Sequence, residues 1–196
     1  MTSAVVASLV QLARDLERVD ARWALVGGFA VSARAEPRFT RDVDVCVLAL
    51  DDEEAERIAL SMVRLGYSVA SVIEHQRAMR LATLRLISPV ADGVFVDLLF
   101  ASTGLEPDAV ESAEALEILP GLVVPVARAA HLVVMKLLAR DDVSRPQDGL
   151  DLRALRHTLT PDDAADVRRL AQEVTTRGYH RGRNLVALAE TYLAGR

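Results

Sequence analysis

The spacing of hydrophobic residues divides the chain into an α/β part followed by a helical part. Apolar residues recur at helical intervals over residues 2–19, which predicts a helix there. Further helices are expected over 29–34 and over 51–65, where an acidic first turn favours the start of the helix. Alternating or continuous apolar runs predict strands over residues 23–26, 42–48, 67–73, 79–87 and 94–100.

Helical spacing dominates the C-terminal third of the chain. Thr160 is expected to cap one of these helices, with Pro161 at its first position. Residues 116–126 contain two prolines and a glycine and are expected to be irregular or extended. We therefore predict an α/β core over residues 1–125 and a helical domain over residues 126–196. The expected helices of that domain cover residues 127–140, 150–158, 161–176 and 184–194.

The composition indicates a globular, cytoplasmic protein. Hydrophobic residues make up 51% of the chain and charged residues 26%. Cys46 is the single cysteine, which excludes an intramolecular disulfide and fits a reducing compartment. No apolar run reaches the roughly 18 residues of a membrane span, so we expect no membrane contact. The first helix lacks a basic start, so it is not expected to be a signal peptide.

The charge of the chain is unevenly distributed. A net charge of −5 argues against a general nucleic-acid binder. From Arg153 to Arg196, however, eight arginines outnumber five acidic residues. This basic tail could meet an anionic substrate, or it could be an ordinary solvated helical surface.

Three acidic residues stand in strands that otherwise belong in a core. Asp42 and Asp44 alternate with valines, so their side chains share one face of a strand. Asp97 is the lone acid in the apolar stretch GVFVDLLF. If these strands are neighbours, three carboxylates converge and require a cation. Hard divalent ions prefer oxygen ligands, and Mg²⁺ is the natural candidate.

Two further features suggest a phosphate ligand. Gly27 and Gly28 follow a strand and precede a helix, so the backbone there can approach an anion closely. The alternative is a plain strand-to-helix turn. Lys136 is the only lysine among 23 basic residues. A flexible ammonium can reach a triphosphate as a point charge, whereas the alternative is an incidental surface lysine.

Together, these residues resemble the nucleotidyltransferase superfamily with the polymerase-β-type fold, whose pattern is matched by VGG, DVDV and the later VDL. Two longer stretches, RFTRDVDV and HLVVMKLLARDDVSRPQDGLDL, resemble the AbiEii/MenT-type toxins of bacterial toxin–antitoxin pairs. This resemblance spans about residues 23–155. Gln147 stands where a basic residue is common, so either Asp148 or Asp151 could be the functional acid. The matching residues are Arg38, Thr40, Asp42, Asp44, Lys136, Arg140, Asp148 and Asp151.

The resemblance implies a mixed sheet with flanking helices, followed by a helical C-terminal region. It also implies Mg²⁺-dependent transfer of a nucleotide from an NTP to the 3′ end of tRNA, which blocks translation, and a cognate antitoxin partner. Asp42 and Asp44 would hold the metal, and Asp97 would position a second metal or accept a proton. Lys136 and Arg140, four residues apart, should share one helix face. The expected nucleotide-binding residues are Gly27, Gly28, Arg38, Thr40, Lys136 and Arg140.

Other interpretations remain open at this stage. The same scaffold could nucleotidylate a small antibiotic, in a strongly acidic site, or it could be a non-catalytic binding protein. Thr40 has two interpretations as well. Its hydroxyl either caps the loop before the strand or faces the metal site, where phosphorylation would add about −1.5 to −2 charge and block NTP binding.

Overall fold

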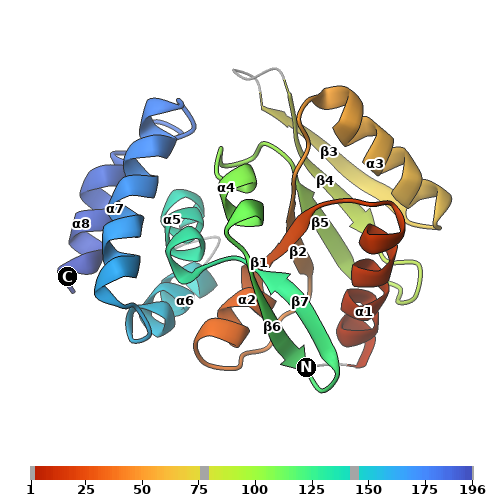
Figure 1. The fold of residues 1–196 in the computed structure, drawn as a ribbon, viewed down its shortest axis with the longest axis horizontal. Helices are drawn as coiled ribbons and strands as arrows, with labels where there is room; N and C mark the ends of the chain where they lie inside the picture. Colours follow the sequence, from red (N-terminus) through yellow and green to blue (C-terminus); the bar gives the residue numbers. More distant parts are fainter. Residues whose placement is uncertain (1–2, 76–79, 142–145, 196) are drawn as a thin grey trace.

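The computed structural model describes residues 3–75, 80–141 and 146–195, and its centre is a seven-stranded mixed β-sheet (Figure 1). The strands follow the order β3-β4-β5-β2-β1-β7-β6 across the sheet. This order places the strands that carry the three candidate carboxylates next to each other. The strands are β1 Trp23–Val26, β2 Val43–Val47, β3 Ser68–His75, β4 Arg80–Ile87, β5 Phe95–Leu99, β6 Glu114–Leu119 and β7 Leu122–Val126.

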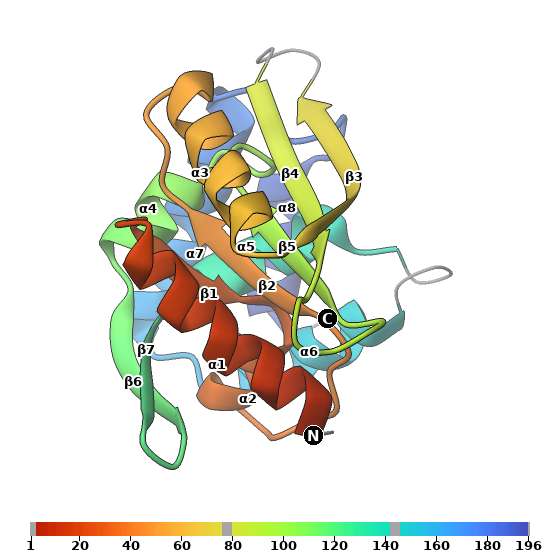
Figure 2. The same ribbon diagram turned by 90° about the vertical axis from the view of Figure 1, so that its right-hand side faces the viewer.

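Helices flank this sheet, and the C-terminal helices form a separate group at one side of it. Figure 2 shows α1 and α3 in front of the sheet, and Figure 1 shows α5 to α8 gathered at the left. No helix among the described residues is long and apolar enough to span a membrane. The helices are α1 Ser3–Arg18, α2 Gly27–Arg34, α3 Asp52–Arg64, α4 Glu106–Glu111, α5 Ala129–Ala139, α6 Pro146–Arg156, α7 Pro161–Thr176 and α8 Leu185–Leu193.

The pairing of the central strands fixes where the acids lie. Strand β2 runs antiparallel to β1 and parallel to β5. In this register Asp44 pairs with Val26 on one side and with Asp97 on the other. Side chains of residues paired in register point to the same face of a sheet. The Asp44 and Asp97 carboxylates therefore lie side by side.

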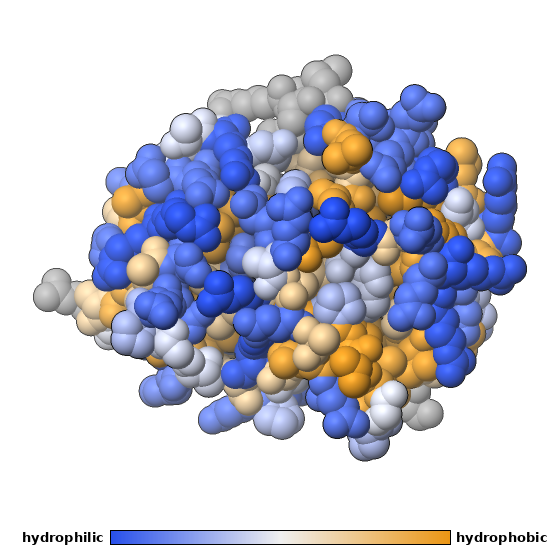
Figure 3. All heavy atoms as spheres, viewed as in Figure 1, coloured by the Kyte–Doolittle hydropathy of each residue, from blue (hydrophilic) through white to orange (hydrophobic). Residues whose placement is uncertain are grey.

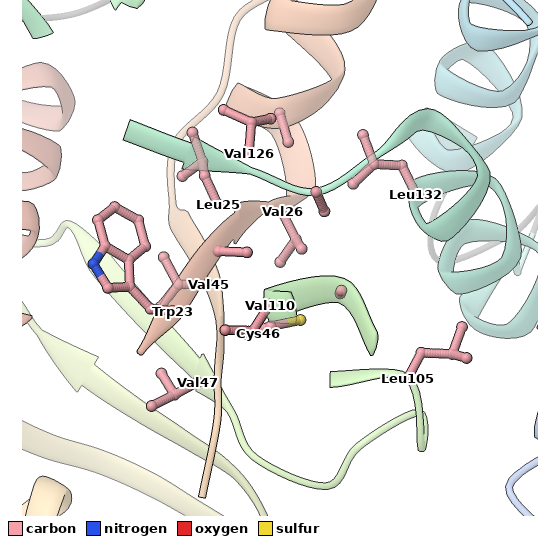
Figure 4. Packing of buried hydrophobic residues seen from close by; sticks show 14 of the residues in the cluster. Trp23, Leu25, Val26, Val45, Cys46, Val47, Leu105, Val110, Val126 and Leu132 are labelled. Atoms are coloured by element: carbon pink, nitrogen blue, oxygen red, sulfur yellow. The ribbon is translucent and has the colours of Figure 1, made fainter. Parts of the chain in front are cut away.

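A continuous hydrophobic core holds these strands in place. The buried side chains of β1 and β2 extend to α4 and α5, among them Leu25, Cys46, Val110 and Leu132 (Figure 4). Burying one Val or Leu side chain contributes about 1.5–3 kcal/mol, so this core anchors the strands firmly. The cluster includes residues on both sides of the proposed domain boundary after residue 125. That boundary stays a prediction.

Most of the elements predicted from the sequence are confirmed within a few residues. The capping prediction is also confirmed, because the Thr160 hydroxyl accepts the backbone N–H of Asp163, whose own carboxylate accepts the Thr160 N–H. The expected helix over residues 150–158 begins earlier, at Pro146. The helix expected from residue 29 begins at Gly27.

Two local features were missed by the sequence pattern. Residues 116–126 are extended, one of the two expected alternatives, but the pattern did not predict that they form most of the antiparallel hairpin of β6 and β7, with Gly121 at φ +78° in the turn. Pro125 is tolerated because β7 meets β1 through a single register pair, Leu25 with Val126. Helix α4 spans only six residues, too few for a helical period to show.

Candidate active site

A cleft of about 1480 Å³ opens where β1 runs into α2, and it collects most of the candidate residues from distant parts of the chain. Its walls come from the start of α2, the loop before β2, strands β4 and β5, and helices α5 and α6. The candidate residues that line it are Gly27, Gly28, Arg38, Thr40, Asp42, Asp44, Asp97, Lys136 and Asp148.

Gly27 makes room for the carboxylate of Asp44. A Cβ atom added to Gly27 would stand 1.9 Å from Oδ2 of Asp44. Gly27 also has φ +62°, in the left-handed region that favours glycine. The glycine therefore allows α2 to start directly against the face of β2 that carries Asp44. At Gly28, the added Cβ would stand 2.6 Å from the hydroxyl of Thr40.

Asp42 and Asp97 occupy different environments beside Asp44. Asp42 precedes β2 by one residue, and its side chain is about a third exposed. Burial raises the pKa of Asp42, and the nearby Asp97 carboxylate raises it further, whereas Arg85 and Arg41 oppose that shift. Asp97 lies within β5 and is buried. The acids therefore crowd one another, as the sequence suggested.

Arg85 on β4 is the main site residue that the sequence analysis missed. Its Nε donates to Oδ1 of Asp97 at 2.8 Å and its Nη2 donates to Oδ2 at 2.6 Å. Nη2 also stands 3.9 Å from Oδ2 of Asp42. A signal was present, because Arg85 and Asp97 are equally distant from Ala91 in the expected turn. A β4–β5 hairpin centred there pairs Arg85 with Asp97, and the structure has this register.

Lys136 lines the cleft from α5 and belongs to a buried charge network. Its Nζ stands 2.7 Å from Oδ1 of Asp148 and 2.8 Å from Oδ2 of Asp151. Arg38 reaches the same Asp151 carboxylate through Nε at 2.6 Å and Nη2 at 2.9 Å. Both aspartates are buried, so their ionised forms require these partners. The network fixes the ammonium of Lys136 and the guanidinium of Arg38 at the edge of the cleft.

The sequence left Asp148 and Asp151 as alternatives for the functional acid, and both carboxylates contact Lys136 in the structure. Asp151 bridges Lys136 and Arg38 from behind the cleft, and Asp148 lines the cleft itself. Arg140 is the C-terminal cap of α5, and its backbone N–H donates to the carbonyl oxygen of Lys136 at 2.8 Å, the helical bond that places it one turn beyond Lys136 as expected. Its ψ of 127° ends the helix after this residue. Arg140 is not among the described residues that line the cleft.

Thr40 lies in the loop before β2 rather than on the strand. Its hydroxyl donates to the backbone carbonyl of Asp42 at 3.2 Å, and the residue is buried. This geometry matches the loop-capping alternative. The side chain nevertheless lines the cleft and packs against Gly28. A group added to its oxygen would therefore enter the space at the start of α2.

The donors in the cleft suit one Mg²⁺ ion bound together with phosphates. Asp42 and Asp44 offer carboxylate oxygens, and Mg²⁺ is usually bound by one or two carboxylates plus substrate phosphates. In the parts of the chain that the structure describes, no three His, Cys, Asp or Glu side chains are already gathered as a metal site. The two carboxylates fit a metal whose other ligands come from the phosphates of the nucleotide.

Comparisons with known structures match this fold. The antibiotic-resistance factor ANT(2″)-Ia superimposes with a TM-score of 0.55 at 13% identity, covering 100% of this chain and 94% of the other. An antigenic nucleotidyltransferase-like protein from Paracoccidioides brasiliensis gives a TM-score of 0.56 at 15% identity, covering 96% and 93%. At such low identity these likenesses show the fold alone. No curated protein matches the chain in sequence.

The sequence comparison with protein families is more specific. The family model described as nucleotidyl transferase AbiEii toxin of type IV toxin–antitoxin systems matches residues 11–192. This range includes the cleft, the charge network around Lys136 and the C-terminal helices. The chain therefore belongs to the AbiEii family of nucleotidyltransferase toxins.

Proposed function

We propose that this toxin transfers a nucleotide from a Mg²⁺-bound NTP to the 3′-terminal hydroxyl of tRNA and thereby blocks translation. One observation carries the proposal: the paired acids Asp42 and Asp44 share a cleft with the positioned ammonium of Lys136. Carboxylates that can bind a cation and an ammonium that can bind an anion lie in the same cleft. This combination suits a substrate that consists of a triphosphate and its metal ion.

In this mechanism Asp42 and Asp44 would hold Mg²⁺, and the chemistry supplied by the ion is neutralisation of charge on the triphosphate. Lys136 and Arg38 bind the non-bridging oxygens and stabilise charge that develops on the leaving pyrophosphate. Asp148 and Asp151 keep both cations fixed, so little reorganisation accompanies the reaction. The backbone at Gly28, at the N-terminus of α2, can approach the phosphates closely.

The charge of the cleft favours a polyanionic acceptor over a cationic antibiotic. Among the residues that the structure describes, five cationic residues line it, and they balance five acidic residues. These are Arg38, Arg41, Arg85, Lys136 and Arg181, and Asp42, Asp44, Glu74, Asp97 and Asp148. A site for a cationic antibiotic is expected to be strongly acidic, which this balanced lining is not, and its arginines can attract the backbone of RNA.

The basic tail contributes less to this surface than its composition suggested. Arg168, Arg169 and Arg177 form ion pairs with acidic residues, mostly of the same tail. Arg181 differs, because it donates to Ser102 and lines the cleft. Most of the tail therefore acts as a solvated helical surface, and Arg181 is its contribution to acceptor binding.

Transfer can be tested by incubating the protein and Mg²⁺ with each α-labelled NTP, in the presence of total cellular RNA or an aminoglycoside. We expect label on a tRNA-sized band, and no label with the Asp44→Asn variant. Label on the aminoglycoside alone would identify antibiotic nucleotidylation instead. Nucleotide binding without any transfer would identify a non-catalytic binding protein. Either result would overturn the proposal.

We further propose that the cognate antitoxin silences the toxin through phosphorylation of Thr40. A phosphate on this buried hydroxyl would stand beside Gly28 and Asp42 and repel the incoming triphosphate. Thr40→Glu should therefore fold but lose NTP binding, whereas Thr191→Glu on the exposed face of α8 should retain it. Mass spectrometry of the Thr40 peptide, with and without the antitoxin, tests the modification. An unmodified peptide together with full activity of Thr40→Glu would refute it.

A further inference from the structure

Arg85 already occupies both oxygens of Asp97, the carboxylate that would otherwise be the third metal ligand. Both oxygens of Asp97 accept hydrogen bonds from its guanidinium, at 2.8 and 2.6 Å. Such a two-point guanidinium–carboxylate pair is among the strongest hydrogen-bonded arrangements in proteins. The pairing arises from the strand register, since Arg85 and Asp97 are direct partners across β4 and β5.

The surroundings keep this pair in place. The Asp97 side chain is 12% exposed, whereas the Arg85 side chain is 40% exposed and lines the cleft. The guanidinium also lies over the ring of Phe95, with its central carbon 5.0 Å from the ring centroid. The Asp97 pair raises the pKa of Arg85 further above its already high ordinary value. The guanidinium therefore stays charged at every pH at which the protein is folded.

A second divalent ion on Asp97 would have to displace this guanidinium. The ion would break two charge-assisted hydrogen bonds, and its double positive charge would repel the positive charge of the Arg85 guanidinium. Nη2 of Arg85 also lies 3.9 Å from Oδ2 of Asp42, so the positive charge of Arg85 already interacts with two of the three acids. Asp42 and Asp44 are left as the pair that can hold one ion.

We infer that Arg85 takes the place of a second metal ion in this site, so the enzyme works with one divalent cation and Asp97 acts as a positioning residue for Arg85. The inference rests on the proposed nucleotide transfer. Arg85 would lie at the acceptor side of the reaction, where its positive charge stabilises the entering oxygen. Its Nη1 makes no hydrogen bond to any residue that the structure describes, so it can donate to substrate.

The test counts metal ions instead of relying on turnover. The protein, in excess over an α,β-methylene analogue of each NTP, is titrated with Mn²⁺ and followed by electron paramagnetic resonance. We expect one Mn²⁺ per bound nucleotide in the wild type, with no spin coupling between ions. Arg85→Gln frees Asp97 and should bind two coupled ions, whereas Arg85→Lys keeps the charge and should bind one. Asp97→Asn should still bind one.

The control is Arg80→Gln, because Arg80 lies on the same strand but pairs with Asp52 outside the cleft. It should behave as the wild type. Two coupled ions in the wild type, a single ion in Arg85→Gln, or loss of an ion in Asp97→Asn would each overturn the inference. If Arg85→Gln does not fold, the wild-type and Asp97→Asn counts decide alone. Failure of every analogue to bind would instead contradict the proposed transfer.

Discussion

The position of Lys136 between two carboxylates suits a lysine better than an arginine. Its ammonium fits between Asp148 and Asp151 at 2.7 and 2.8 Å, with the side chain only 12% exposed. A guanidinium is planar and wider, so it cannot adopt the same position without moving one carboxylate. The absence of lysine elsewhere in the chain is consistent with a specific requirement at this position.

We therefore predict that Lys136→Arg lowers kcat/KM by about 100-fold or more although the charge is retained. The reason is that the positive charge would leave the position that the proposed mechanism requires beside the triphosphate oxygens. Steady-state kinetics with the preferred NTP measure this effect. Arg168→Lys, on the exposed surface of α7, is the matched control and should be neutral. Near-wild-type kinetics for Lys136→Arg would show that the lysine is incidental.

Gly27 allows a second prediction at the residue scale. Gly27→Ala places a Cβ against Asp44 and forces a left-handed conformation on alanine, so we expect a loss of about 1–3 kcal/mol in unfolding free energy. Transfer should fall with it, because Asp44 must move. Gly149 in α6 has open space around its Cα, so Gly149→Ala should stabilise the fold by about 0.5–1 kcal/mol. Urea unfolding of both variants gives the comparison, and equal stabilities would contradict this account of Gly27.

At the scale of elements, the packing of α5 against α7 contains a buried histidine. His131 on α5 is buried, and neither ring nitrogen hydrogen-bonds to a described residue. Burial lowers its pKa from 6.5 to about 4, and the charged side chains around it are Asp108, Arg128, Asp166 and Arg169. The unfolded chain therefore binds a proton at a higher pH than the folded chain does.

It follows that stability is lost as the pH falls from about 6.5 towards 4, by up to about 3 kcal/mol from this one group. His131→Leu removes the titrating group. The unfolding free energy of this variant minus that of the wild type should therefore increase as the pH falls through this range. Urea unfolding at pH 7.5 and at pH 4.5 measures the difference. An advantage that is independent of pH would show that His131 is not the group that titrates.

How much could be predicted from the sequence also depends on scale. Strands β1 and β2 were predicted because apolar runs ending in glycine or alternating with acids are local signals. Helix α4 was not predicted, because six residues show no period. The β6–β7 segment was expected to be irregular or extended, but its pairing into a hairpin was not predicted, because its prolines obscure the strand pattern. Helix α5 was predicted to within two residues because its helical spacing continues to Ala139.

The same contrast holds for the site. Asp42, Asp44, Asp97 and Lys136 were identified because each is chemically unusual in its own segment. Arg85 was missed because an arginine on a strand of an arginine-rich chain is inconspicuous. Only its pairing across the β4–β5 hairpin shows that it belongs to the site. Contacts between strands decide its role, and these are not local properties of the sequence.

Across the whole molecule, the sheet and the C-terminal helices have different surfaces. On the face shown in Figure 3, hydrophilic side chains cover most of α7 and α8, and hydrophobic ones gather near the β6–β7 hairpin. The ion pairs of α7 account for much of the hydrophilic surface. Cationic side chains from both halves of the chain line the cleft. They are Arg38 from the α/β part, and Lys136 and Arg181 from the helical part.

The central claim is that the protein transfers a nucleotide to the terminal hydroxyl of tRNA, with the help of a metal ion bound by Asp42 and Asp44. The most direct measurement compares intact tRNA with periodate-oxidised tRNA as acceptors for α-labelled NTP, using the wild type and Asp42→Asn. We predict labelling of intact tRNA only, and a decrease of about 100-fold or more in Asp42→Asn, which should melt no lower than the wild type because charge crowding is relieved. Equal labelling of oxidised tRNA, or more than about one part in a hundred of wild-type activity in Asp42→Asn, would contradict it.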